Sequence, residues 1–219
     1  MPVEATIFDD LRAVANPKKA AEMRAYMRDQ FDFLGVATPV RRAVSRTLLK
    51  TTDHNRIDWD FVADCWNQPE REFQYLAVDY LDACRRALSS DDMPALRRLI
   101  TTKSWWDTVD GIDSLVGDIV ARDPGLKQTM LAWSLDDNIW LRRVAIDHQL
   151  LRKQDTDVPL LAKIIENNLG QTEFFVTKAI GWALRDYAKT DPEWVRRFVD
   201  ANRHRLAPLS IREATKHLE

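Results

Sequence analysis

A dipeptide made of a small residue and a β-branched residue recurs along this chain at a constant interval of 34 residues. Each copy lies in a longer stretch with helical spacing of apolar residues, preceded by a shorter stretch of the same kind. Such dipeptides are common in any helical protein, but a fixed register over five copies favours stacked two-helix units. The sequence therefore predicts an all-α chain, an α-solenoid forming one superhelical domain over residues 1–219. The five copies are Ala43-Val44, Ala77-Val78, Gly111-Ile112, Ala145-Ile146 and Ala179-Ile180.

Helical spacing of apolar residues extends through nearly the whole chain, and strand-like alternation is absent. Only 6 Gly and 9 Pro occur, too few turn-forming residues for a many-stranded sandwich or barrel. Polar residues suited to cap helices stand at Asn16, Thr38, Asp123, Asp157, Thr172 and Asp191. The predicted helices are 3–15, 17–32, 39–51, 58–67, 70–88, 91–101, 105–121, 124–134, 138–152, 157–168, 173–189, 191–203 and 208–218.

Charge and cysteine content exclude several classes of protein. The 32 Lys and Arg residues nearly balance 34 Asp and Glu residues, so a polyanion would have to be bound by basic residues gathered on one surface. Cys65 and Cys84 are too few for a disulfide framework, and the histidines show no zinc-binding spacing. No basic and apolar leader and no long apolar run is present. We expect a metal-independent protein without cofactors, located in the cytoplasm and not in a membrane.

The repeat also predicts which side chains face away from the core. At about 100° per residue, the positions five, two and one before the small residue and three after it lie roughly opposite the buried side. Large aromatic and cationic residues share this predicted outer face with one acid. Its occupants are Trp106, Trp140, Arg41, Arg143, Arg42, Asp110, Lys178 and Trp182.

This outer face is suited to bind nucleic acid. Arg and Lys side chains can contact phosphates, and Trp rings can pack on sugars or bases. Asp110 does not fit simple binding, because a carboxylate repels phosphates, and this favours a reactive role. Taken singly, Asp110 and Arg143 could be ordinary surface charges, and most Trp residues pack in a core. Their shared register is what singles them out.

Several motifs resemble those of one family, the bacterial AlkD-type DNA alkylation repair glycosylases, which are built of HEAT-like helical repeats. The resemblance covers nearly the whole chain. It is carried by Lys103-Ser104-Trp105-Trp106-Asp107-Thr108-Val109-Asp110, by Ala25-Tyr26-Met27 with Phe33-Leu34-Gly35-Val36, by Pro69-Glu70-Arg71-Glu72-Phe73-Gln74, by Asp137-Asn138-Ile139-Trp140-Leu141-Arg142-Arg143, by Lys178-Ala179-Ile180-Gly181-Trp182-Ala183-Leu184-Arg185, and by Leu209-Ser210 with Arg212-Glu213-Ala214.

The resemblance implies a curved superhelix with a concave DNA-binding face. It also implies hydrolysis of the N-glycosidic bond of 3-methyladenine and 7-methylguanine in duplex DNA, without lyase action and without a deep base pocket. By matching position, Tyr26, Trp106 and Trp182 would form an aromatic cleft, Asp110 would be the catalytic carboxylate, and Arg143 would lie near the damaged nucleotide. Arg42, Trp140, Lys178 and Arg185 are further expected DNA contacts.

The chemistry of alkylated purines is consistent with a single catalytic acid. A purine alkylated at N3 or N7 leaves as a neutral base, so no general acid is needed, while positive charge builds on the deoxyribose. Asp110 would stabilise that charge and orient a water molecule, and Arg143 would hold a phosphate. We expect a monomer acting on alkylated duplex DNA. The alternative is a non-catalytic helical-repeat scaffold that binds DNA or a protein partner.

Overall fold

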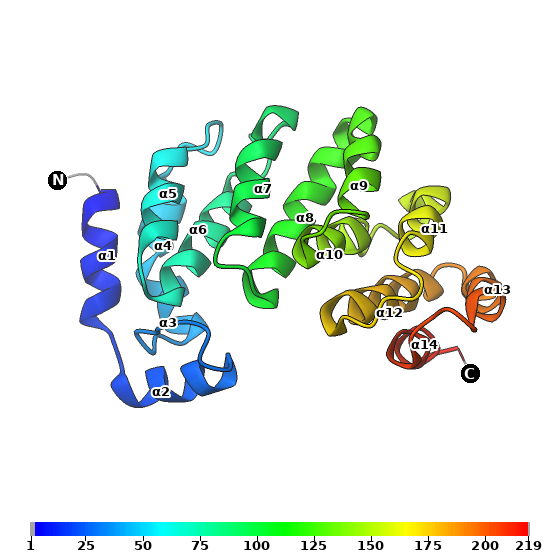
Figure 1. Ribbon diagram of the computed structural model, residues 1–219. Helices are drawn as coiled ribbons and strands as arrows, with labels where there is room; N and C mark the ends of the chain where they lie inside the picture. Colours follow the sequence, from blue (N-terminus) through cyan, green and yellow to red (C-terminus); the bar gives the residue numbers. More distant parts are fainter. Residues whose placement is uncertain (1–2, 219) are drawn as a thin grey trace. The chain divides into compact units, whose positions relative to one another are not determined.

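The computed structural model describes residues 3–218 and the side chains of residues 6–218. Within that part of the chain it contains fourteen α-helices and no β-strand (Figure 1). Three short 3-10 turns, at Ser90–Asp92, Pro124–Leu126 and Lys153–Asp155, accompany them. None of the helices within these residues is long and apolar enough to span a bilayer. The expected all-helical fold is confirmed.

The chain comprises two compact units, Met1–Leu88 and Ser89–Glu219, which are described separately. The expectation of one domain over residues 1–219 stays a prediction. The first unit contains α1 (Val3–Ala13), α2 (Pro17–Tyr26), α3 (Thr38–Val44), α4 (Arg46–Thr51), α5 (Trp59–Asn67) and α6 (Arg71–Ala83). The second contains α7 (Met93–Thr101), α8 (Trp106–Arg122), α9 (Lys127–Trp133), α10 (Ile139–Asp147), α11 (Val158–Glu166), α12 (Phe174–Ala188), α13 (Pro192–Asn202) and α14 (Pro208–Ala214).

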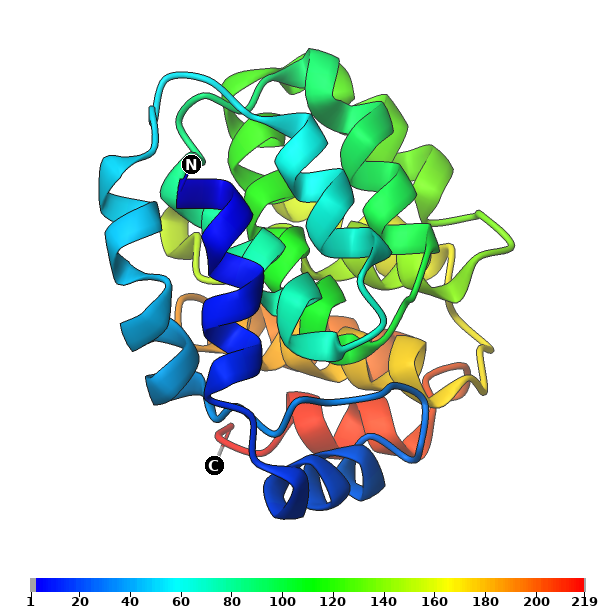
Figure 2. The same cartoon turned by 90° about the vertical axis from the view of Figure 1, so that its left-hand side faces the viewer.

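Helix pairs follow the 34-residue period. The five dipeptides lie in α3, α6, α8, α10 and α12, and a shorter helix precedes each of the last four. In the second unit α7 packs against α8 and α9 against α10, while α10 contacts both α8 and α12. α12 packs in turn on α14, and the two helices lie side by side in both views (Figures 1 and 2). The arrangement is that of a helical-repeat solenoid.

Most small and β-branched residues of the later repeats are buried as predicted, among them Ile112, Ala145 and Ile146, whereas Gly111 is only partly buried. The first repeat differs, because Ala43 is exposed at the end of α3. There Arg41 is buried instead, contrary to its predicted outward orientation, and its Nη2 pairs with Asp79 Oδ2 at 3.0 Å. The helical register therefore fails in the first repeat.

Capping side chains set several helix starts where the sequence placed them. The carboxylates of Asp157 and Asp191 and the side-chain oxygen of Asn16 accept backbone N–H groups three residues further along the chain. Thr38 and Thr172 were wrong as caps, because Ala37 and Glu173 hold those positions without a side-chain hydrogen bond.

Helix ends are less well predicted than helix starts. The expected helix 39–51 is two helices that meet at Ser45, whose hydroxyl donates a hydrogen bond to the Arg41 carbonyl. The expected helix 17–32 stops early, because Arg28 and Asp29 adopt positive φ angles that an α-helix does not contain. The expected helix 138–152 ends at Asp147, ahead of a turn that reaches a positive φ angle at Leu151.

A buried carboxylate anchors the connection between α2 and α3. The Glu72 side chain accepts hydrogen bonds from the backbone N–H groups of Leu34, Gly35 and Val36 at 3.0, 2.9 and 2.9 Å. Gly35 has φ +81°, and an added Cβ would lie 2.1 Å from the Asn16 carbonyl oxygen. The connection therefore needs glycine at this point and an acid at the start of α6.

Candidate functional site

The centre of the candidate site is an ion pair between neighbouring helices of the second unit. Arg143 of α10 reaches both carboxylate oxygens of Asp110 of α8, with Nε to Oδ1 at 2.7 Å and Nη2 to Oδ2 at 2.8 Å. This two-point geometry fixes the orientation of the carboxylate as well as its position. The Asp110 side chain keeps 25% of its surface exposed, whereas Arg143 keeps 2%.

The second unit buries Arg143 on several sides. Its Nη1 donates to the Phe175 backbone carbonyl at 2.9 Å, and its Nη2 lies 3.7 Å from Asp147 Oδ2. Burial alone lowers the pKa of Arg143, but the neighbouring carboxylates outweigh that effect and raise the pKa above its usual value. The predicted outward orientation of Arg143 is wrong, because α8 and α12 cover the guanidinium from both sides.

Trp182 and Lys178 continue the site along α12. The guanidinium carbon of Arg143 lies 5.2 Å from the ring centre of Trp182, and Lys178 Nζ lies 5.3 Å from the same ring. The same Nζ is 5.5 Å from the ring of Phe174, which is 48% exposed. Phe174, Lys178 and Trp182 are spaced four residues apart, so they share one helix face. The result is a partly exposed aromatic and cationic strip beside Arg143.

Trp106 lies one helical turn before Asp110 on α8 and is partly exposed. Residues four apart on a helix point to the same side, so the indole and the carboxylate share a face of α8. The structure thus links Asp110, Arg143, Trp182 and Lys178 in one chain of contacts, and Trp106 lies on the same face of α8 as Asp110.

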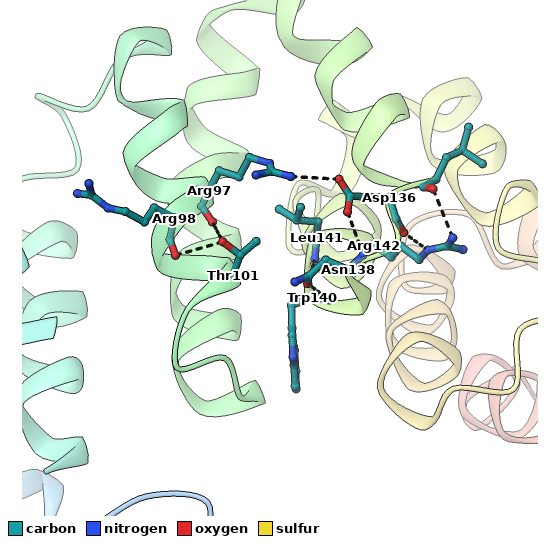
Figure 3. A network of polar contacts seen from close by, with 9 residues as sticks. Arg97, Arg98, Thr101, Asp136, Asn138, Trp140, Leu141 and Arg142 are labelled. Atoms are coloured by element: carbon teal, nitrogen blue, oxygen red, sulfur yellow. Dashed lines mark hydrogen bonds and ion pairs between the residues drawn. The ribbon is translucent and has the colours of Figure 1, made fainter. Parts of the chain in front are cut away.

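Trp140 does not join this strip. It is 8% exposed and packs with Trp105 and Phe175, whose ring centres lie 5.8 and 4.8 Å away. Figure 3 shows its indole pointing away from the polar network at the start of α10, where Asn138 caps the helix and Asp136 pairs with Arg97. The prediction that Trp140 faces outward is wrong, because α10 is covered on more than one side.

The remaining expected DNA contacts occupy different surroundings. Arg185 Nη1 pairs with Glu213 Oε2 at 2.7 Å, which links α12 to α14. Tyr26 and Arg42 belong to the first unit, where Tyr26 is 72% exposed at the end of α2 and Arg42 is exposed near the end of α3. Their DNA contacts stay predictions.

Two further acids, missed by the sequence analysis, lie behind the ion pair. One carboxylate oxygen from each of three acids, Asp110, Asp113 and Asp147, lies within 4.8 Å of the other two. Burial and then the neighbouring carboxylates raise the pKa of Asp113 well above its usual range, and burial raises the pKa of Asp147 to about 7. Carboxylates at this spacing could hold a cation, but the Arg143 guanidinium already supplies positive charge to them, and we assign the group no metal.

Aspartate is a common residue, and no motif in the sequence singles out Asp113 or Asp147. Their spacing was available, however: Asp113 follows Asp110 by three residues and Asp147 follows Arg143 by four. Each acid therefore lies on the same helix side as one member of the ion pair. Recognising them required knowing that α8 and α10 face each other.

Comparison with known proteins shows which family this chain resembles. The family described as DNA alkylation repair enzyme matches residues 7–218, nearly the whole chain. The chain is a member of that family.

A solved structure supports the assignment to the DNA alkylation repair enzymes. It is described as a predicted DNA alkylation repair enzyme from Enterococcus faecalis. The two sequences are 37% identical, the match covers 93% of this chain and 96% of the other, and the TM-score is 0.85. A search of curated proteins gave no match. Membership of this family supports an enzymatic role in the repair of alkylated DNA.

Proposed function

We propose that the protein is a DNA glycosylase that hydrolyses the N-glycosidic bond of cationic alkylated purines, chiefly 3-methyladenine and 7-methylguanine, in duplex DNA. The observation that carries the proposal is the partly exposed Asp110 carboxylate, held at two points by Arg143, whose guanidinium also lies over the ring of Trp182. Family membership supplies the class of damage. The geometry supplies the group that would act on the sugar.

The ion pair leaves Asp110 capable of this role. An ionised carboxylate offers about four lone-pair sites, and Arg143 uses two of them. The exposed part of the side chain therefore retains acceptor capacity for a water molecule or for the sugar. Because the alkylated base leaves uncharged, the reaction needs stabilisation of the sugar and delivery of water, and one acid provides both.

The aromatic side chains assist at the same point. Trp106 and Trp182 would present their π faces to the deoxyribose, and the attraction grows as the sugar becomes cationic. Lys178, Arg42 and Tyr26 are the side chains we propose as DNA contacts. Arg143, being buried, orients Asp110 in this proposal instead of holding a phosphate.

The test incubates the pure protein with a methylated DNA duplex in the presence of EDTA and measures free 3-methyladenine and 7-methylguanine. We expect both bases to be released faster than they depart spontaneously, from a protein that behaves as a monomer. Tight DNA binding without release above the spontaneous rate would contradict the glycosylase and favour the scaffold alternative. Release that requires a metal would contradict the metal-independent mechanism.

A further inference from the structure

The acids behind the ion pair lie where they can control it. Asp113 is 5% exposed and Asp147 is 1% exposed, and neither faces solvent as Asp110 does. Asp147 belongs to the same helix as Arg143, one turn later, and Asp113 belongs to the same helix as Asp110. The proposed mechanism uses neither of them.

The carboxyl group of Asp147 is held without hydrogen bonds. Neither of its carboxyl oxygens has a hydrogen-bond partner in the structure, and both are buried. Arg143 Nη2 lies 3.7 Å from Asp147 Oδ2, close enough for attraction, but the same nitrogen donates to Asp110 Oδ2 at 2.8 Å. The Arg143 guanidinium is thus hydrogen-bonded to Asp110, whereas its contact with Asp147 is a longer ion pair without a hydrogen bond.

The charges of the group do not balance if every acid is ionised. Three carboxyl groups would face one guanidinium, and two of the three have almost no access to water. Buried like charges at this separation cannot all persist, and the usual outcome is that the acids retain a proton. The raised pKa values of Asp113 and Asp147 agree with this count.

We propose that Asp113 and Asp147 together retain one proton, carried by either carboxyl group without a hydrogen bond between them, and that in this state they act as positioning residues that leave Arg143 on both oxygens of Asp110. This inference rests on the proposed function and adds to it a protonation state that governs the orientation of Asp110. The shared proton weakens the attraction of Asp147 for the guanidinium. Asp110 therefore keeps the orientation that the reaction needs.

Loss of the proton should disturb the site. The charged groups that act on Asp147 are Arg143 on its own helix and Asp110 and Asp113 on α8. Once the pair is fully ionised, Asp147 competes for Nη2 of Arg143, and the two-point contact with Asp110 is strained or lost. A displacement of about 1 Å in a reacting group can cost roughly a hundredfold in rate. Base release should therefore fall as the pH rises past the titration of the pair.

The experiment measures single-turnover release of methylated bases by the full chain as a function of pH. We expect the parent rate to fall by about tenfold per pH unit above the titration of the pair and to level off roughly a hundredfold below its starting value. Asp147→Asn is uncharged at every pH, so it should retain the neutral-pH rate to within about threefold and lose this alkaline decline. Asp137→Asn removes the same charge from an exposed position before α10, and should keep the decline of the parent.

A second readout does not depend on activity. Burial raises the pKa of Asp147 from 3.8 to about 7, so the folded protein becomes less stable relative to the unfolded chain as the pH rises across that interval. The thermal midpoint of Asp147→Asn relative to the parent should therefore increase across that interval, and the midpoint of Asp137→Asn should not. Asp113→Asn provides the same comparison if Asp147→Asn fails to fold.

The two readouts separate the possible failures. An alkaline decline that is unchanged in Asp147→Asn, or a flat difference in thermal midpoint, would overturn the shared-proton proposal while leaving the glycosylase intact. Absence of base release in every protein, together with a rising midpoint difference, would overturn the proposed function and confirm the shared proton alone.

Discussion

At the residue scale, the proposed acid Asp110 is held by an arginine that has almost no access to water. Asp110 is partly exposed, as the register predicted, yet Arg143 and Trp140 are buried. A helical wheel assumes one buried side, whereas α10 packs against α8 on one side and α12 on the other. The side chains that fill those contacts could not be oriented without knowing which helices are neighbours.

Replacing Arg143 tests its reassignment from DNA contact to supporting residue. Arg143→Ala leaves Asp110 and Asp147 without their cation, and breaking a buried pair in this way costs about 3–5 kcal/mol of unfolding free energy. Urea titration measures that loss.

DNA binding by the same variant gives the complementary result. Because Arg143 is buried, the slope of binding affinity against salt concentration should match that of the parent. A slope reduced by about one unit would show a phosphate contact and contradict the supporting role.

At the element scale, helix starts could be predicted because a capping side chain and its backbone partner are close in sequence. Asp157 and Asp191 show this. Helix ends depend on backbone angles, as at Arg28 and Asp29 after α2, and on longer-range packing, which local patterns do not encode. The close approach of α8 to α10 is one such feature, and it decides whether Asp110 and Arg143 meet.

Gly117 permits that approach. A Cβ at this position of α8 would lie 2.1 Å from the backbone carbonyl oxygen of His148, at the end of α10. Gly117→Ala should push the helices apart, lower the unfolding free energy by about 1–3 kcal/mol, and slow base release because the ion pair is strained. Gly125→Ala is the control, since the Cβ there would meet only the Asp123 side chain, at 3.1 Å. Equal effects of the two substitutions on stability and release would contradict the role of Gly117.

At the scale of the whole molecule, the period of 34 residues was sufficient to predict helical repeats, because a repeat is a property of the sequence itself. The relation between residues of different repeats was not predictable in the same way. Asp113 and Asp147 become one group only through the pairing of α8 with α10, and nothing local marks either acid.

Stability of the molecule should depend on pH through His148 as well as Asp147. Burial lowers the pKa of His148 to about 4, below its usual 6.5. A base with a depressed pKa contributes stability that is fully present above 6.5 and is lost as the pH falls through 4, by up to about 3 kcal/mol.

Urea titrations of the parent and His148→Gln check this contribution. The unfolding free energy of the parent relative to the variant should decrease as the pH is lowered across that interval. Asp147 acts in the opposite direction over much of the same range, so the difference between the two proteins, and not the parent curve alone, is the informative quantity. A constant difference would show that His148 is not buried in its neutral form.

The central claim is that the Asp110 carboxylate drives base release, and Asp110→Asn tests it most directly. The substitution keeps the shape of the side chain and removes its charge. Single-turnover release from methylated duplex DNA should fall by about a hundredfold to a thousandfold, while DNA binding is retained or strengthened because a carboxylate no longer repels phosphate. Release near the parent rate by a folded Asp110→Asn protein would contradict the account.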